Sequence, residues 1–145
     1  MRQLIIVRKD LNMSTGKIAA QVAHASMAFI SAMLKESKQK KTETAMNIDL
    51  TIDLDVWQNW FCDIYTKTVC EAKNRNSLLK CTEIAKTLDL KEGQDYFLVK
   101  DHCLTELEPE EIDSDGTGKT LTCIGFRPLP DDLAKSISKK YQLLR

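Results

Sequence analysis

The sequence predicts a single α/β domain over residues 1–145, built as a four-stranded mixed β-sheet with helices on its faces. Two observations carry this prediction. The chain has 145 residues, of which 43% are apolar, and this is enough for one hydrophobic core. Short runs rich in β-branched and aromatic residues also alternate along the chain with segments of helical period.

Each element is predicted from its own local pattern. The first strand is a continuous apolar run, as expected for a strand buried on both faces of a sheet. A long helix follows, because Ser14 or Thr15 can cap it and apolar residues then recur at helical spacing. The predicted strands are residues 3–8, 66–72, 96–99 and 120–126. The predicted helices are residues 14–34, 54–62, 76–88 and a short one opened by residues 128–132.

Two segments fit neither period, and their charges are opposite. Residues 35–47 are polar and predict a linker, whereas residues 106–118 predict an acidic insertion. The chain as a whole has no net charge. Residues 1–45, however, hold eight Lys or Arg against three acids, and residues 99–116 hold seven acids against one Lys. A neutral total therefore hides a basic front end and an acidic loop.

The cysteines indicate a reducing compartment. They are five, an odd number, and no two are spaced as Cys-x-x-Cys, so a zinc site of the usual spacing is not expected. Unpaired thiols are typical of cytoplasmic proteins. The one apolar run near the N-terminus, Leu4–Val7, is too short for a signal-peptide core or a membrane span. We therefore expect a cytoplasmic protein that carries no metal or cofactor and enters no membrane.

The most informative local feature is the start of the long helix. The sequence Ser14-Thr15-Gly16-Lys17 follows a strand and a short loop, and it places free backbone N–H groups and a cationic side chain at one point. Unpaired N–H groups and the helix dipole attract anions. The spacing is not that of the Gly-x-x-x-x-Gly-Lys-Ser/Thr phosphate loop, so nucleoside triphosphate binding is not predicted. The feature by itself predicts an anion-facing lysine.

A longer run around this helix start resembles a known family. Residues 7–25, Val-Arg-Lys-Asp-Leu-Asn-Met-Ser-Thr-Gly-Lys-Ile-Ala-Ala-Gln-Val-Ala-His-Ala, are similar to the signature of the type 2 peptidyl-tRNA hydrolases. Residues 66–70 resemble the family's second strand, and residues 120–130 resemble its Thr-x-x-x-Ile-Gly-Pro-x-Pro close. Members of that family cleave the ester between a peptide's carboxyl end and the 3′-terminal ribose of tRNA. Their fold, a four-stranded mixed sheet flanked by helices, agrees with the local patterns.

The resemblance implies a set of site residues. Lys17 matches the family's active-site lysine, and Asp101 and Thr105 match the Asp and Thr of its Asp-Ala-Gly-x-Thr-Gln motif. In these roles Asp101 would orient and deprotonate a water, Lys17 would stabilise the developing oxyanion, and Thr105 would hold the water or the carboxylate. Peptidyl-tRNA is the implied partner, and a homodimer is implied because members often pair. The expected substrate-binding residues are Ser14, Gly16, Gln21, His24 and Thr120.

The sequence departs from the family around the aspartate. Residues 101–106 read Asp-His-Cys-Leu-Thr-Glu, so Ala-Gly has become bulkier and the Gln has become acidic. The insertion at 106–118 also lengthens the loop that follows. Two alternatives to peptidyl-tRNA hydrolysis therefore stay open: a binding module for RNA or protein that has lost turnover, and a hydrolase of a different acyl ester. An insertion folded over Lys17 would exclude tRNA, whereas one that projects away would admit it.

Several further side chains have two interpretations each. Trp57 and Trp60 could stack on RNA bases, although a role in the core or a lid is favoured. His102 and Cys103 could ligate a metal, although adjacent side chains of an extended chain point in opposite directions. His24 could contact substrate or be a satisfied, partly buried histidine.

Overall fold

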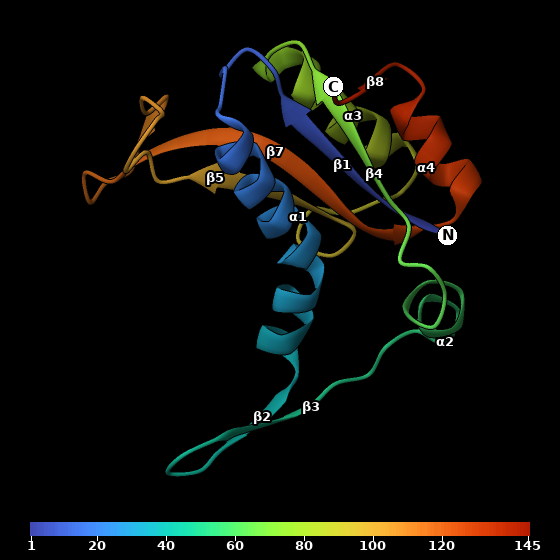
Figure 1. Cartoon of the computed structure of the whole chain (residues 1–145). Coiled ribbons are helices and arrows are strands. Elements are labelled where there is room, and N and C mark those ends of the chain that lie inside the picture. The colour runs from blue at the N-terminus through green and yellow to red at the C-terminus, as the bar shows by residue number, and fades with distance from the viewer.

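The computed structural model describes the whole chain as a central sheet between one long helix and two shorter ones (Figure 1). The four predicted strands are all present, and they are neighbours in the sheet, with β5 at one edge. Strand β1 runs parallel to β4, whereas β7 is antiparallel to both β1 and β5, so the predicted mixed sheet is confirmed. The main strands are β1 (Arg2–Arg8), β4 (Lys67–Ala72), β5 (Tyr96–Asp101) and β7 (Gly118–Leu129).

The predicted strand count of four is too low. The sheet has six strands in the order β5-β7-β1-β4-β8, with β6 paired to β7 off this path. The two additional strands are β6 (Glu111–Ile112) and β8 (Gln142–Leu143). Strands of two residues are too short to show an alternating pattern, and for this reason the sequence does not predict them.

The helices cover both faces of the sheet. Helix α1 (Thr15–Glu36) packs on one face over a cluster of six buried residues, and helices α3 (Arg75–Thr87) and α4 (Asp131–Ser138) enclose a larger cluster of 15 on the other. Asn74, not the expected Asn76, caps α3, because its side-chain oxygen accepts the Ser77 N–H at 2.9 Å.

Helix α1 lies unusually close to the sheet. A Cβ atom at Gly125 of β7 would be 2.4 Å from the carbonyl oxygen of Ala25, so only glycine allows this approach. Ala25 and Phe29, on the predicted apolar stripe, are buried against the sheet. By length and composition alone α1 could also cross a membrane, but such a helix is equally typical of a protein core. Here one face of it forms part of the core.

A hairpin replaces most of the predicted linker. Strands β2 (Lys38–Lys41) and β3 (Met46–Asp49) pair in antiparallel register and project from the body together with the end of α1 (Figure 1). Every residue of both strands is exposed. The hairpin buries nothing. Strand β2, Lys-Gln-Lys-Lys, has no apolar residue that could show a strand period, whereas β3, Met-Asn-Ile-Asp, alternates although neither of its faces is buried.

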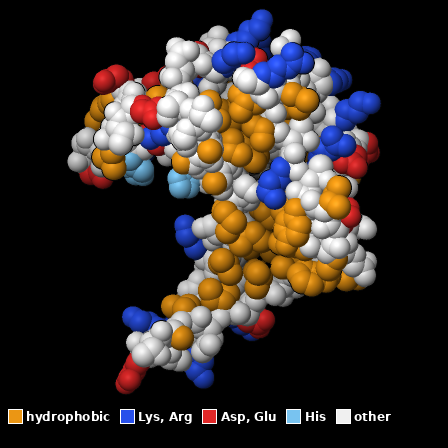
Figure 2. All heavy atoms as spheres, viewed as in Figure 1, with side chains coloured by type: hydrophobic (Ala, Val, Ile, Leu, Met, Phe, Trp, Pro, Cys, Tyr) orange, Lys and Arg blue, Asp and Glu red, His pale blue; other side chains and the backbone are white.

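The segment after the hairpin returns to the body through α2 (Leu54–Val56) and a π-helical turn, η1 (Trp57–Phe61), close to the predicted helix at 54–62. Trp60 is buried and meets Phe29 edge to face at 5.9 Å, which confirms the core interpretation of this tryptophan, whereas Trp57 is 48% exposed. Figure 2 shows apolar side chains along the hollow between the body and the hairpin. A cavity of about 420 Å³ lies between Phe29 and Leu133.

Candidate active site

The structure brings the three expected catalytic residues together. Lys17 is the third residue of α1, Asp101 is the last residue of β5, and Thr105 lies in the loop that follows. The Lys17 ammonium lies 2.7 Å from Asp101 Oδ2 and donates to the Thr105 hydroxyl at 3.3 Å. The Lys17 and Asp101 side chains are only 14% and 11% exposed, so the ion pair is shielded from solvent on most sides.

Asp101 receives hydrogen bonds on both carboxylate oxygens. Oδ2 accepts from Gln21 Nε2 at 2.8 Å in addition to the lysine, and Oδ1 accepts from the Cys103 N–H at 2.9 Å. Burial by itself would raise the pKa of Asp101, yet these donors and the charge of Lys17 together lower the pKa below its ordinary value. Asp101 is therefore ionised at neutral pH.

Gln21 joins the Asp101 carboxylate to β7 through a chain of hydrogen bonds. Its side chain is buried, and its Oε1 accepts a hydrogen bond from the Thr122 hydroxyl of β7 at 2.7 Å. Thr122 thereby fixes which way the amide points, so that Nε2 faces Asp101. We therefore place Gln21, expected to bind substrate, among the groups that hold the carboxylate. Sequence reasoning missed Thr122, whose one signal is a polar residue inside an apolar strand.

The turn after Asp101 has a backbone conformation that favours glycine, although no glycine is present there. Cys103 has φ of 55°, in the left-handed region, at the position where the family's motif has Gly. This conformation costs a non-glycine residue about 1–2 kcal/mol. The turn is nonetheless closed by the Cys103 N–H on Asp101, and the thiol lies 3.4 Å from the Thr120 hydroxyl. The bulkier residues have not opened the turn.

The anion site predicted at the helix start is filled by the chain itself. Ser14 caps α1, as expected, and its hydroxyl accepts the Lys17 N–H at 3.3 Å. The Glu106 carboxylate accepts both the Ser14 N–H, at 2.9 Å, and the Ser14 hydroxyl, and these bonds lower the pKa of Glu106. Gly16 is exposed, and no atom lies within 4 Å of where its Cβ would be. Helix start and dipole thus stabilise a glutamate of the following loop.

Thr120 is the cross-strand partner of Asp101, but it lies inside the protein and not in the cleft. It is fully buried in β7, its hydroxyl donates to the Glu108 carbonyl at 2.7 Å, and it accepts the Glu110 N–H at 3.0 Å. Thr120 therefore holds the acidic insertion in place. The structure does not place its hydroxyl where a substrate could reach it.

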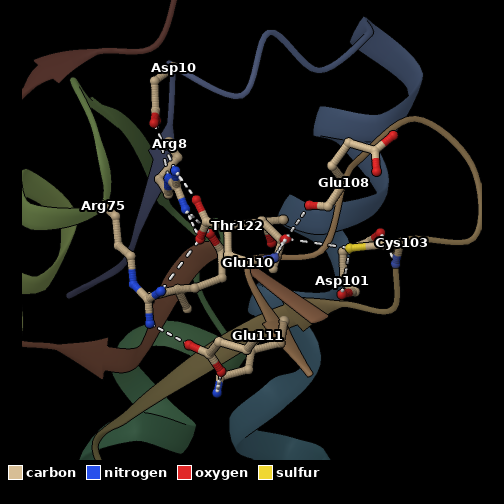
Figure 3. Close-up of polar contacts among 12 residues, drawn as sticks. Arg8, Asp10, Arg75, Asp101, Cys103, Glu108, Glu110, Glu111 and Thr122 are labelled. Carbon is tan, nitrogen blue, oxygen red and sulfur yellow. Dashed lines mark hydrogen bonds and ion pairs between the residues drawn. The ribbon is translucent and has the colours of Figure 1, made fainter. Parts of the chain in front are cut away.

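The insertion is fixed to the body by ion pairs (Figure 3). Arg8, only 4% exposed, binds Glu110 and Asp10 through both guanidinium edges, with its closest contacts at 2.7 Å. Arg75 contacts Glu110 and Glu111, and Lys100 also pairs with Glu111. Much of the negative charge that the sequence shows in this segment is therefore compensated by neighbouring cations.

An open cleft of about 330 Å³ adjoins the ion pair. It contains the three expected catalytic residues, Gln21 and His24, but no residue of the insertion at 106–118. The first residue of the insertion, Glu106, contacts Ser14 at the start of α1, and the insertion then projects away from that helix (Figure 1). Sequence reasoning did not assign three of the lining residues to the site. The lining residues are Lys17, Gln21, His24, Lys100, Asp101, His102, Leu104 and Thr105.

The cleft shows no metal-binding group. Nowhere in the chain do three His, Cys, Asp or Glu side chains gather so as to hold a metal ion. His102 and Cys103, considered above as ligands, have no third partner. That the protein works without a cofactor remains a prediction.

Comparison with known proteins decides the family. The sequence model described as Peptidyl-tRNA hydrolase PTH2 matches residues 1–144. The chain belongs to this family. A relative named peptidyl-tRNA hydrolase from Methanopyrus kandleri is 36% identical over 145 residues, covering 99% of this chain and 98% of that protein. Relatives of the same name are 27% identical in Saccharolobus solfataricus (99% of each chain) and 29% identical in Thermococcus onnurineus (99% and 97%).

Membership of the PTH2 family agrees with the resemblance found in residues 7–25, the run that forms the end of β1 and the start of α1. A solved structure of a protein of unknown function from Agrobacterium covers 99% of this chain and 97% of its own. At 12% identity and a TM-score of 0.48 it carries no argument.

Proposed function

We propose that this protein hydrolyses the ester that joins a peptide or an N-blocked amino acid to the 3′ end of tRNA. The observation that carries the proposal is the contact between Lys17, Asp101 and Thr105 at the edge of an open cleft. The named relatives are peptidyl-tRNA hydrolases, which gives the substrate class. The chemistry then follows from the free hydrogen-bonding positions of these side chains.

Asp101 is suited to bind the attacking water at one particular atom. Oδ2 is already occupied by Lys17 and Gln21, whereas Oδ1 accepts only the Cys103 N–H. A carboxylate oxygen has two lone pairs, so Oδ1 keeps one for a water. The ionised carboxylate orients that water and takes its proton as the oxygen attacks the ester carbonyl carbon.

Lys17 is suited to stabilise the negative charge that develops. Of its three N–H donors, one meets Asp101 and one meets Thr105, so the third is free to point into the cleft. It can bind the carbonyl oxygen as that oxygen becomes an oxyanion. Collapse of this intermediate breaks the bond to the ribose oxygen, which receives the proton held by Asp101, and leaves a peptide carboxylate and a free tRNA hydroxyl.

The acidic insertion does not oppose this reaction. Its residues lie outside the lining of the cleft, and several of its acids are paired with Arg8, Arg75 and Lys100. Its first residue, Glu106, lies at the start of α1 near Lys17, but no residue of the insertion lines the cleft. The cleft therefore keeps room for tRNA, which favours hydrolysis.

The test is release of N-acetyl amino acid from purified N-acetyl-aminoacyl-tRNA. We expect turnover by the wild type and a 10²- to 10⁴-fold lower kcat for Asp101→Asn, which keeps the shape but removes the base. Asp89→Asn is the matched control, because Asp89 is exposed and Asn tolerates its left-handed φ of 58°. A wild type that binds tRNA without turnover would instead establish a binding module. A wild type that cleaves only other esters would establish a hydrolase of a different acyl ester.

A further inference from the structure

We propose that His24 and His102 form a subsite for the 3′-terminal nucleoside of the tRNA, with the base held between the two imidazoles. The proposal rests on the proposed function, because it assigns the nucleic-acid half of that substrate to one end of the cleft. It concerns side chains that the reaction described above does not use. Neither histidine contacts Lys17, Asp101 or Thr105 through a hydrogen bond or an ion pair.

The distribution of histidine in this chain is the first observation. The protein has two histidines in 145 residues, and both line the same cleft. They come from opposite walls: His24 lies on α1, and His102 lies in the turn that follows β5. Both are exposed, and both line the cleft. Neither wall needs a histidine to fold, since neither side chain is part of the core.

The charges of the cleft indicate which end receives the nucleic acid. The helix start is blocked by the Glu106 carboxylate, which Ser14 holds through two hydrogen bonds. A phosphate placed there would be repelled by that carboxylate at short range. The RNA must therefore leave the ester in the opposite direction, along α1 toward His24, and the peptide lies on the other side.

The spacing along α1 fits a nucleoside. His24 is seven residues after Lys17, which is two helical turns on the same stripe and about 10.5 Å along the axis. An ester carbonyl at Lys17 then places the ribose between the two residues and the base beside His24. Imidazoles stack on nucleobases, and stacking on an aromatic side chain strengthens binding by about 5- to 100-fold per base. Leu104, 87% exposed at the rim, adds an apolar edge to the same end.

His102 makes this subsite specific to the present chain. The motif that the chain resembles has Ala at this position, and an alanine could cover only one side of a base. His102 lines the cleft and therefore supplies a second stacking surface that an alanine would lack.

Nuclear magnetic resonance of the imidazole C–H groups tests the subsite independently of turnover, because two histidines give two resolvable sets of signals. Titration of the wild type with the trinucleotide CCA should shift both sets, with saturation, and CCU should bind more weakly because a pyrimidine stacks over a smaller area. Unchanged histidine signals at saturating CCA would overturn the proposal. Shifts without hydrolysis of acylated tRNA would leave the subsite standing and overturn the proposed function.

Kinetics provide the second arm. We expect the wild type to prefer the N-acetyl-aminoacyl ester of adenosine over the same ester of methyl riboside, which has the same leaving group but no base, by about 10-fold or more in kcat/KM. This ratio should fall toward 1 in the double variant His24→Ala, His102→Ala, and it should be retained in His24→Phe, His102→Phe, which keep a stacking surface. Lys139→Ala, at the distant end of α4, is the control and should keep the wild-type ratio. An alanine variant with an undiminished ratio would overturn the subsite.

Discussion

The two walls of the cleft position their site residues with hydrogen bonds of similar length, but the backbone that carries these residues differs. The helix wall carries Lys17 and Gln21 on regular, capped α-helix, within the run that most resembles the family. The turn wall carries Asp101 in the most altered segment, next to a cysteine with a left-handed backbone. Yet both walls meet in hydrogen bonds of 2.7 to 2.9 Å.

The difference shows which atoms hold the carboxylate. Of the three donors on Asp101, two are side chains of α1 and one is the backbone N–H of Cys103. A backbone donor survives changes of side chain, so the turn wall could diverge without releasing Asp101. The helix wall holds Asp101 through the side chains of Lys17 and Gln21, so replacing these side chains removes the hydrogen bonds. Substitutions of the helix side chains that hold Asp101 should therefore cost more activity than substitutions of the turn residues that follow Asp101.

Among the residues that hold Asp101, Lys17 should have the largest effect when it is replaced by Met. Removing the donor for the oxyanion lowers kcat by about 10²- to 10³-fold. Lys17 also lowers the pKa of Asp101, and burial would raise it, so the acid limb of the pH–kcat profile should move to higher pH in the variant. In the wild type that limb lies below the ordinary range of an aspartate, and activity is lost as pH falls through it. Initial rates between pH 4 and 8 measure both effects, and the exposed Lys80→Met is the control. An acid limb at the same pH in wild type and Lys17→Met would show that Lys17 does not determine the ionisation of Asp101.

Gln21→Leu should have an intermediate effect. The variant removes one hydrogen bond to an ionised carboxylate, worth about 1.5–3 kcal/mol, and kcat should fall by roughly 10- to 100-fold with little change in KM. Thr122 keeps a partner for its hydroxyl in the Val99 carbonyl, at 3.1 Å, so the fold should persist. Thr122→Val should cause a smaller loss, and in the double variant the two losses should not add. A raised KM at constant kcat would instead place Gln21 in direct contact with substrate.

Cys103→Gly and Cys103→Val test the turn wall through stability. Glycine removes the left-handed penalty, partly offset by its greater freedom in the unfolded chain, so the free energy of unfolding should rise by about 0.5–1 kcal/mol. Valine, β-branched, should lower it by about 1–3 kcal/mol. Urea unfolding measures both, and kcat of Cys103→Gly should stay within about threefold of wild type because the N–H that holds Asp101 remains. A large loss of activity in that variant would contradict the role given to the backbone.

Glu106→Gln should have the smallest effect. The amide keeps an acceptor for Ser14 while removing a negative charge near Lys17. We expect KM for tRNA to fall by less than about threefold at low salt, and the difference to vanish as salt increases. A tenfold change in either constant would mean that the carboxylate itself takes part in the reaction.

The fold was largely predictable because it depends on local periods. The buried run of β1 and the apolar stripe of α1 are visible in the sequence, and they place Lys17 at a helix start beside the sheet. The hairpin at β2 and β3 was not predicted as a hairpin: β2 is entirely polar, and the alternation that begins at Ile48 predicts only an extended segment at 48–52, which overlaps the end of β3. Elements that contribute little to the core have only a weak apolar periodicity from which they could be predicted.

The candidate site was predictable in its members but not in their arrangement. That Lys17, Asp101 and Thr105 belong together came from the family resemblance, not from spacing. The orientation of the Gln21 amide depends on a hydrogen bond from Thr122, about a hundred residues away in the sequence, and no local pattern predicts such a contact. The same holds for Glu106 at Ser14, where the sequence suggests an empty anion site and the fold supplies a carboxylate.

The ion pairs of the insertion also change the electric field that the molecule presents at a distance. Residues 106–118 contain six acids, and four cations of the body and of β7 pair with them. Opposite charges in contact act as dipoles, which are screened beyond a Debye length of about 8 Å at physiological salt. Residues 35–41, in contrast, hold four exposed lysines and one glutamate, and none of these lysines has an ion-pair partner. A distant polyanion therefore experiences the attraction of the hairpin more strongly than the repulsion of the acidic block, although the sequence alone suggests the reverse.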